Sequence, residues 1–363
     1  MDLSRRQFAG LGGAAVAFAV AGRGIAARAG DTPAAQAGSS NSIDARLAPI
    51  DPELRPAARR MLEMGTPPIS AATLRRAPPD AGAPKVTLLN DVTVAERRVA
   101  AQGTLPEVTV YVVNADGAKR RPAILHVHGG GFIVGAARTE LRYLQETARA
   151  LDCVIVTVEY RLAPETRYTG STEDTYAGLK WLYAQADELG ADRGRIAVMG
   201  ESAGGGHAAI LAIRARDRGE VPLAFQALVY PMLDDRTGSG APVPPHIATV
   251  GWSPPENRFG WQSFLGMEPG GSNVPVAAVP ARLQNLAGLP PAFIGVGGVD
   301  LFAAEDMAYA RRLTLADVPT ELLVVPRAFH GFDRVAPDTT LARQFTKAKL
   351  NALRRAFGEQ VVI

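Results

Sequence analysis

The sequence has one cysteine, few aromatic residues and no long apolar run. With a single Cys among 363 residues, no intramolecular disulfide can form and a cysteine-rich metal site is excluded. A hydrophobic share of 47% with 21% charged and 6% aromatic residues is typical of a globular chain and excludes wholesale disorder. No segment approaches the roughly 18 consecutive apolar residues of a membrane-spanning helix, so we expect no stable span in the mature protein.

The first 29 residues have the composition of a signal peptide (1–29). A basic start precedes an uncharged run over 9–22, and two Ala-x-Ala patterns offer cleavage after Ala29 or after Ala37. The pattern Ser-Arg-Arg-Gln-Phe at 4–8 resembles a twin-arginine export signal, with an ordinary secretory signal as the alternative. We therefore expect a periplasmic or secreted protein that leaves the cytoplasm through the twin-arginine pathway.

The small excess of basic residues lies in this segment. The chain has 39 Lys and Arg against 36 Asp and Glu; residues 1–29 hold four Arg and one Asp, so 35 of each remain. A nucleic-acid partner is therefore not expected for the mature chain. The sequence leaves open whether the protein forms a homodimer.

From residue 86 onward, apolar β-branched runs alternate with helical periodicity. The predicted strands cover 108–113, 123–127, 153–159, 196–199, 223–230, 292–296 and 321–325. The predicted helices cover 138–150, 172–189, 203–217, 303–316 and 339–357. This alternation predicts an α/β fold with a mostly parallel sheet, helices on both faces and ligand sites at the carboxyl ends of the strands.

Two proline-rich segments lack this alternation. One is the N-terminal segment 43–83, which follows a low-complexity linker at 30–42, and the other is an insertion at about 234–289. Long irregular insertions in α/β domains are usually functional. We predict that both segments form a cap over the active site of a domain spanning 84–363.

The sequence Gly200-Glu201-Ser202-Ala203-Gly204 follows a predicted strand and opens a predicted helix. This context is typical of a nucleophile elbow, in which glycines make room for a strained turn that exposes the serine hydroxyl. Ser202 is therefore the candidate nucleophile. The N–H group of Ala203 at the helix start is a candidate donor to a developing oxyanion.

A second glycine-rich motif, His128-Gly129-Gly130-Gly131, follows the predicted strand at 123–127. Glycines let the backbone approach a reacting carbonyl oxygen without a Cβ. Phosphate binding is the alternative, but neither GxGxxG nor a following Lys-Ser/Thr accompanies these glycines.

A serine nucleophile needs a base and an acid that orients the base, and in this architecture both follow it in the chain. Of five histidines, only His330 comes after a predicted strand and its short exit loop, downstream of Ser202. The candidate acid is Asp300, at the carboxyl end of the strand at 292–296, with Asp306 as the alternative.

Taken together, these motifs resemble the hormone-sensitive-lipase-like (bacterial family IV) carboxylesterases of the α/β-hydrolase superfamily. The resemblance covers about 85 to the C-terminus and includes 128–131, 160–165, 200–205, 230–231 and 329–332. It implies a capped α/β-hydrolase fold, with an oxyanion hole formed by the N–H groups of Gly130, Gly131 and Ala203.

The expected activity is that of a lipase-like serine carboxylesterase that hydrolyses short-to-medium acyl-chain esters through an acyl-enzyme at Ser202. The expected partner is a small-molecule ester, and neither a metal nor a cofactor is required. Three alternatives stay open: an amidase or peptidase on the same scaffold, a non-catalytic ligand-binding relative, and a surface interaction module.

Overall fold

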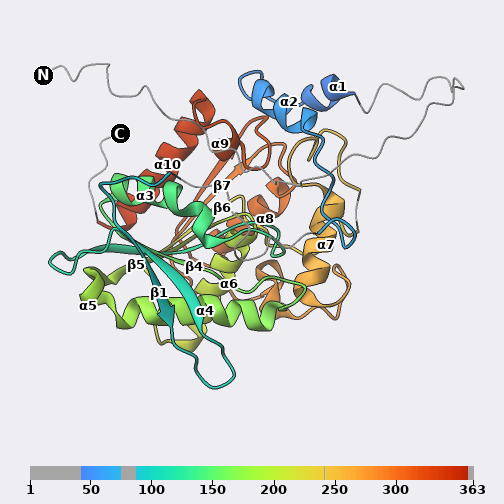
Figure 1. Ribbon diagram of the computed structural model, residues 1–363. Coiled ribbons are helices and arrows are strands. Elements are labelled where there is room, and N and C mark those ends of the chain that lie inside the picture. Colours follow the sequence, from blue (N-terminus) through green and yellow to red (C-terminus); the bar gives the residue numbers. More distant parts are fainter. Residues whose placement is uncertain (1–41, 75–86, 241, 359–363) are drawn as a thin grey trace, which may run out of the picture.

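The computed structural model describes residues 42–74, 87–240 and 242–358 (Figure 1). The predicted signal peptide and all but the last residue of the predicted linker lie outside these ranges. Among the described residues, no helix is long and apolar enough to cross a membrane.

An eight-stranded sheet forms the centre of the protein, in the order β1-β2-β4-β3-β5-β6-β7-β8. Antiparallel pairing is confined to β1 with β2 and β2 with β4, and the remaining pairs are parallel. This confirms the predicted fold class, the α/β-hydrolase fold. The strands are β1 Val94–Val99, β2 Val108–Val113, β3 Arg121–Val127, β4 Val154–Val158, β5 Ala191–Glu201, β6 Phe225–Val229, β7 Ala292–Gly297 and β8 Thr320–Val325.

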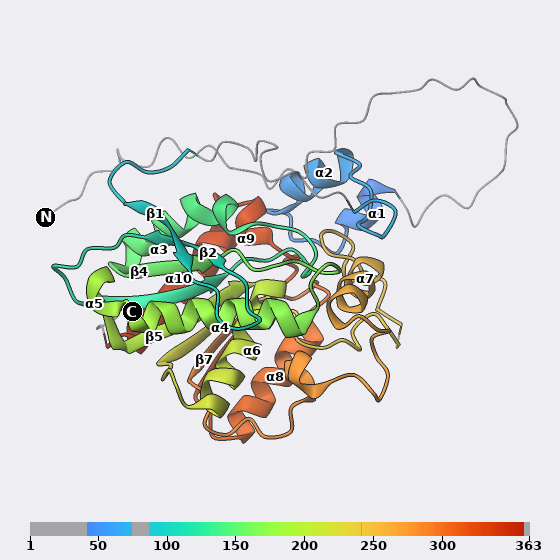
Figure 2. The ribbon, with the colours of Figure 1, turned by 60° about the horizontal axis from the view of Figure 1, so that its bottom comes forward.

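Helices cover both faces of this sheet (Figures 1 and 2). On one face lie η1 Ala137–Glu140, α3 Leu141–Leu151, α9 Phe332–Val335 and α10 Thr340–Ala356. On the other lie α4 Tyr168–Ala184, α5 Ala186–Leu189, α6 Ala203–Arg218 and α8 Ala303–Leu315. Both faces of the central strands are therefore buried, and β3, β4 and β6 consist entirely of buried residues.

The first strand, β1, has no counterpart among the strands predicted from the sequence. It reads Val-Ala-Glu-Arg-Arg-Val, and its three central residues are exposed. Because β1 lies at the edge of the sheet and pairs only with β2, charged side chains are tolerated on it and help to protect the edge from further pairing. Such a strand lacks the apolar run by which the buried strands were predicted.

Residues 43–74 of the N-terminal segment lie beside the central insertion, above the end of the sheet where β5, β7 and β8 finish (Figures 1 and 2), and the rest of the predicted segment, 75–83, is outside the described residues. The N-terminal segment contributes α1 Ile43–Leu47 and α2 Arg55–Glu63, and the insertion contributes α7 Pro254–Leu265, η2 Val276–Ala278 and η3 Pro280–Arg282. The segments are joined by hydrogen bonds from Arg46 Nε to the Thr249 carbonyl (2.9 Å) and from the Ile69 N–H to Glu256 (3.1 Å).

The N-terminal segment also contacts the loop that follows β8. The guanidinium of Arg327 donates to the carbonyl groups of Ala48, Pro49 and Ile50, and the N–H of Asp51 donates back to the Arg327 carbonyl. The position of this loop determines where the candidate base lies, because the loop leads directly to His330.

Candidate active site

Ser202 lies at a sharp turn between β5 and α6. Its backbone has φ 57° and ψ −124°, a conformation that costs a non-glycine residue roughly 1–3 kcal/mol and persists only where the surroundings enforce it. Two hydrogen bonds do so: the Ser202 N–H donates to Val229 (2.9 Å), and the Met232 N–H donates to the Ser202 carbonyl (3.0 Å). At Gly200 an added Cβ would lie 2.2 Å from the Gly204 carbonyl oxygen, so the turn requires glycine there.

Asp300 and His330 lie on neighbouring loops that follow β7 and β8. The two loops are joined directly, because the N–H of Val299 donates to the Ala328 carbonyl (3.1 Å). Asp300 is buried, and one of its carboxylate oxygens accepts a hydrogen bond from the Phe302 N–H (2.9 Å). The other oxygen remains free to face the histidine.

The structure brings Ser202, His330 and Asp300 into one hydrogen-bonded series. The Nδ1 atom of His330 lies 2.8 Å from Asp300 Oδ2, and its Nε2 atom lies 3.0 Å from Ser202 Oγ. Since the carboxylate can only accept, Nδ1 carries the proton and Nε2 is available to accept one from the serine. The alternative acid, Asp306, is fully buried, and neither of its carboxylate oxygens has a hydrogen-bond partner among the residues that the structure describes.

The glycine-rich loop that carries two of the three predicted oxyanion donors lies against the elbow, since a Cβ added at Gly129 would lie 3.4 Å from Ser202 Cβ. Within the described residues, the N–H groups of Gly130, Gly131 and Ala203 donate to no protein acceptor. The N–H of Ala203 belongs to the first turn of α6, where such groups lack helical partners and the helix dipole favours negative charge. The three groups are thus free to stabilise an oxyanion.

The remaining histidines do not reach the reacting atoms. His126 bonds to Glu201 and Thr157, and His246 is exposed in the insertion. Burial lowers the pKa of His128 to about 4 and that of His207 to about 3, so both rings are neutral. Each packs against the ring of Tyr160, at centroid distances of 4.3 and 4.5 Å, which makes them packing residues.

Aromatic side chains to which the sequence assigned no individual role surround the site. The rings of Tyr230 and Phe302 meet His330 edge-on, with centroids 4.8 and 5.2 Å away. The indole of Trp252, from the central insertion, lies against Gly131, where an added Cβ would meet it at 2.3 Å. The crowding of aromatic residues in the insertion was a signal for such contacts, but it could not indicate which ring makes them.

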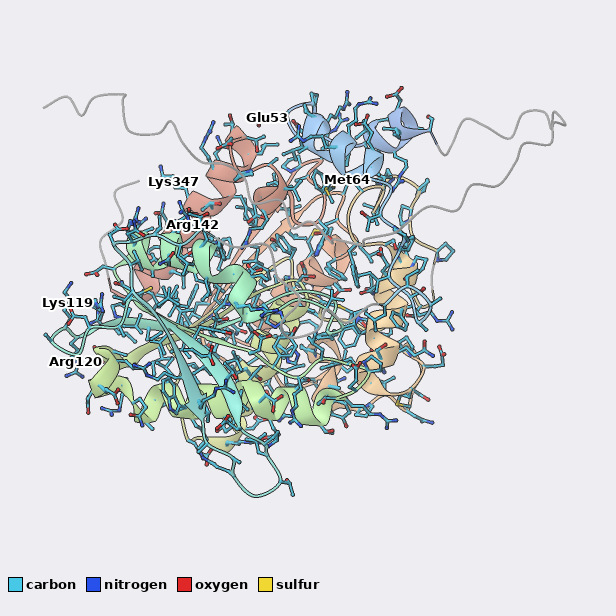
Figure 3. The ribbon with its side chains drawn as sticks, viewed as in Figure 1. Glu53, Met64, Lys119, Arg120, Arg142 and Lys347 are labelled. Atoms are coloured by element: carbon cyan, nitrogen blue, oxygen red, sulfur yellow. The ribbon has the colours of Figure 1, made fainter. Side chains whose placement is uncertain are left out.

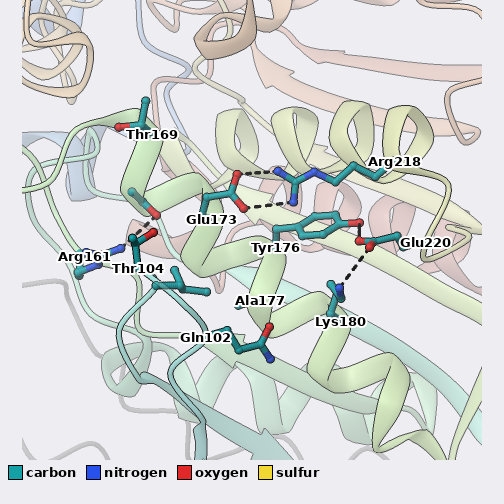
Figure 4. A pocket seen from close by; sticks show the side chains of 12 residues that line it. Gln102, Thr104, Arg161, Thr169, Glu173, Tyr176, Ala177, Lys180, Arg218 and Glu220 are labelled. Carbon is teal, nitrogen blue, oxygen red and sulfur yellow. Dashed lines mark hydrogen bonds and ion pairs between the residues drawn. The ribbon is translucent and has the colours of Figure 1, made fainter.

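A surface groove of about 610 Å³ lies elsewhere, between the β1–β2 connection, α4 and the end of α6 (Figure 4). Its charged side chains pair with one another or with Asp174: Glu173 with Arg218, Lys180 with Glu220, and Arg161 with Asp174. The triad residues do not line this groove. No cluster of potential metal ligands occurs in the part of the chain that the structure describes.

A nucleophile elbow followed along the chain by an acid and then a histidine, on a sheet of this topology, defines the α/β-hydrolase class of proteins. Comparison with known proteins agrees, since residues 124–334 match the alpha/beta hydrolase fold family. The chain therefore belongs to this family.

Individual relatives are named esterases. Over 240 residues, 64% of this chain and 72% of the relative, the chain is 37% identical to "Esterase LipI" of Mycobacterium tuberculosis (strain ATCC 25618 / H37Rv). "Carboxylesterase NlhH" of the same strain is 34% identical over 276 residues, 74% of this chain and 84% of the relative. A solved structure titled "Bacterial Heroin Esterase" matches with a TM-score of 0.73 and 35% identity, covering 85% of this chain and 98% of that one. These likenesses confirm the core of the family resemblance that the sequence motifs indicated.

Proposed function

We propose that the protein is a serine carboxylesterase that hydrolyses short-to-medium acyl-chain esters through an acyl-enzyme on Ser202. The observation that carries the proposal is the position of His330, whose two ring nitrogens lie 2.8 Å from Asp300 and 3.0 Å from Ser202. The esterase names of the relatives support the ester as substrate class.

In the proposed mechanism, Ser202 Oγ attacks the ester carbonyl carbon while His330 Nε2 accepts the hydroxyl proton. The negative charge that develops on the carbonyl oxygen is stabilised by the N–H groups of Gly130, Gly131 and Ala203. His330 then donates its proton to the departing alcohol, leaving the acyl group on Ser202. A water molecule, deprotonated by His330, attacks the acyl carbon; the bond to Ser202 Oγ then breaks, His330 returns the proton to that oxygen, and the acid is released. Asp300 keeps the imidazole in the required tautomer throughout.

Trp252 supports a limit on acyl-chain length. Its indole lies against Gly131, beside the proposed oxyanion hole, and its Nε1 donates to the buried Asn257 (3.2 Å), which fixes the ring. A fixed aromatic wall next to the reacting carbonyl leaves less room for a long chain.

Turnover of p-nitrophenyl esters from acetate to palmitate tests the activity and the chain length together. We expect hydrolysis of the acetate and butyrate, a decline beyond about eight carbons, and no rate above background for Ser202→Ala. A fluorophosphonate probe should label the native protein and not this variant. Absence of both turnover and labelling would refute the esterase proposal, and labelling with preferential cleavage of anilides would indicate an amidase.

We further propose export through the twin-arginine pathway. The proposal rests on the Ser-Arg-Arg-Gln-Phe pattern at 4–8 and the uncharged run after it, in residues outside the described structure. Replacing Arg5 and Arg6 with Lys should retain the full-length chain in the cytoplasm of an expressing bacterium. Unchanged export of the double variant would contradict this route.

A further inference from the structure

A cluster of buried ionic side chains lies behind the nucleophile elbow, on the side of the sheet covered by α3 and α10. Lys349 of α10 is 0% exposed, and its ammonium donates to the hydroxyl of Tyr143 at 2.5 Å. That hydroxyl donates in turn to Glu201 Oε1 at 2.9 Å. The second oxygen of Glu201 lies 2.8 Å from His126 Nε2, and the other nitrogen of that ring is 2.9 Å from Thr157 Oγ1. We call Lys349, Tyr143 and Glu201 the lysine relay.

A second branch of the cluster comes from α9, directly after the catalytic histidine. The guanidinium of Arg334 lies over the ring of Tyr143, 3.8 Å from its centroid, and donates to Glu140 at 2.8 Å. Its neighbour Asp333 is buried and accepts a hydrogen bond from the Tyr230 hydroxyl at 3.0 Å. The ring of Tyr143 therefore contacts the cations of both branches, because the Lys349 ammonium also lies 4.8 Å from its centroid.

Both branches end beside residues of the proposed mechanism. Glu201 immediately precedes Ser202, so the position of its carboxylate fixes the start of the elbow. Asp333 follows His330 by three residues and holds Tyr230, whose ring meets the His330 imidazole edge-on. The cluster thus connects the loop that carries the nucleophile with the loop that carries the base.

The charges of the cluster depend on one another. Burial raises the pKa of the Glu201 carboxyl, but His126, Lys349 and Arg334 outweigh burial and hold that pKa at about 2, so the group is ionised. Burial lowers the pKa of Lys349, while Asp333 and Glu201 act in the opposite direction. In the described structure the Lys349 ammonium has one hydrogen-bond partner, the Tyr143 hydroxyl. Burying such a charge costs free energy of folding unless nearby carboxylates compensate it.

We propose that Lys349 is a positioning residue for the reaction, which acts through Tyr143 and Glu201 to hold Ser202 in register with His330. The inference rests on the proposed esterase function. A neutral side chain of similar volume would fill the same space in α10 but could neither anchor the Tyr143 hydroxyl nor balance Glu201. A change in this relay should therefore reach the chemistry as well as the stability of the fold.

The charges of the relay also give the proposal a readout in the pH profile of the variants. The titratable and polar groups that contact His330 are Asp300 from the loop after β7, Ser202 from the elbow and Tyr230 directly after β6. Asp333 of α9 lies one contact further away, hydrogen-bonded to Tyr230. Loss of the Lys349 cation leaves the carboxylates of the cluster less compensated, so in the Lys349→Met variant we expect positive charge nearby to be favoured. Loss of the Glu201 charge has the opposite effect.

The experiment compares Lys349→Met, Glu201→Gln, the double variant and Lys347→Met in the p-nitrophenyl butyrate assay across pH. Lys347 is the matched control, because it lies on the same helix and is exposed (Figure 3). We expect kcat of Lys349→Met to fall by roughly 10- to 10²-fold, as for a small misplacement of reacting groups, with KM little changed. The acid limb of the pH profile of kcat should move to higher pH in Lys349→Met and to lower pH in Glu201→Gln. In the double variant it should return toward the position of the wild type.

Activity of the wild type is the separate test of the proposed function. If the wild type turns over and Lys349→Met keeps its kcat and its acid limb, Lys349 is a structural residue and the proposal is wrong. Shifts of the two single variants in the same direction also overturn it. Should Lys349→Met not fold, Tyr143→Phe removes only the bridging hydroxyl: a several-fold loss of kcat at an unchanged melting temperature supports the relay, and wild-type kcat refutes it.

Discussion

Replacing Gly131 with Ala tests the oxyanion hole and its aromatic wall together. An added Cβ would lie 2.3 Å from Trp252 Cη2 and 2.5 Å from Cζ2, whereas real Cβ contacts rarely fall below 3.4 Å. The indole or the Gly131 backbone must therefore move by about an ångström. Movement of the indole strains its hydrogen bond to Asn257, and movement of the backbone displaces an oxyanion donor.

The size of the effect has two parts. Gly131 has φ +59°, so an alanine there costs about 1 kcal/mol in backbone strain alone. Loss of one oxyanion donor typically lowers kcat by about 10²–10³-fold, or roughly 2.7–4 kcal/mol. We therefore expect Gly131→Ala to lose at least 10²-fold in kcat with p-nitrophenyl butyrate, and only a few degrees in melting temperature.

Gly219 offers a matched control for the strain. Its φ is +66°, but an added Cβ would meet no atom within 4 Å. Gly219→Ala should show a similar loss of stability with wild-type kcat. If Gly131→Ala retains kcat within about twofold, the assignment of its N–H to the oxyanion hole is refuted.

Three further predictions concern Asp300 of the triad, the buried Asp306 and the N-terminal segment. Asp300→Asn should lower kcat by about 10⁴-fold in steady-state kinetics without a large change in melting temperature, because the wrong tautomer of His330 is then favoured. Asp306→Asn should keep kcat within twofold of wild type. A large loss of kcat for Asp306→Asn together with little loss for Asp300→Asn would show that the acid is misassigned. Burial, reinforced by Glu305 and Asp300, raises the pKa of Asp306 well above 3.8, so the folded state holds a proton that the unfolded state releases as pH rises above 3.8. Stability from this group is therefore lost with rising pH, and Asp306→Asn should stabilise the protein more at pH 8 than at pH 4.5 in urea unfolding; an equal effect at both values would contradict the shift. Arg327→Ala removes the exposed guanidinium that holds the N-terminal segment, and should lower the melting temperature by about 2–4 °C and speed proteolysis within 42–74; unchanged proteolysis would show that other contacts suffice.

The buried strands could be predicted from the sequence because each is marked by a local run of apolar residues. The run at 108–113 is apolar and β-branched, and β2 has these bounds. The strand β5 begins at Ala191, five residues before its predicted start. The first five residues, Ala-Asp-Arg-Gly-Arg, were not predicted as strand because they contain no apolar run. The edge strand β1 was missed for the same reason: its arginines and glutamate face solvent.

The candidate site divides in a similar way. Ser202, Asp300 and His330 follow strands in a fixed order, so motif and position together single them out, and the structure places them in contact. Lys349 could not be found in this manner, because a lysine in a C-terminal amphipathic helix is normally expected at the surface. Only the packing of α10 against α3 and α9 shows that its ammonium is buried.

The contact between Glu53 and the start of α10 has a consequence for the folding kinetics of the chain. The carboxylate of Glu53 accepts hydrogen bonds from the N–H groups of Thr340 and Leu341, and so joins residues 287 and 288 positions apart. Contacts of such separation close the largest loops, and the entropy of closing them makes them slow to form. We therefore expect the N-terminal helices to dock late in refolding, after the sheet has formed, so that the recovery of activity lags behind the recovery of secondary structure.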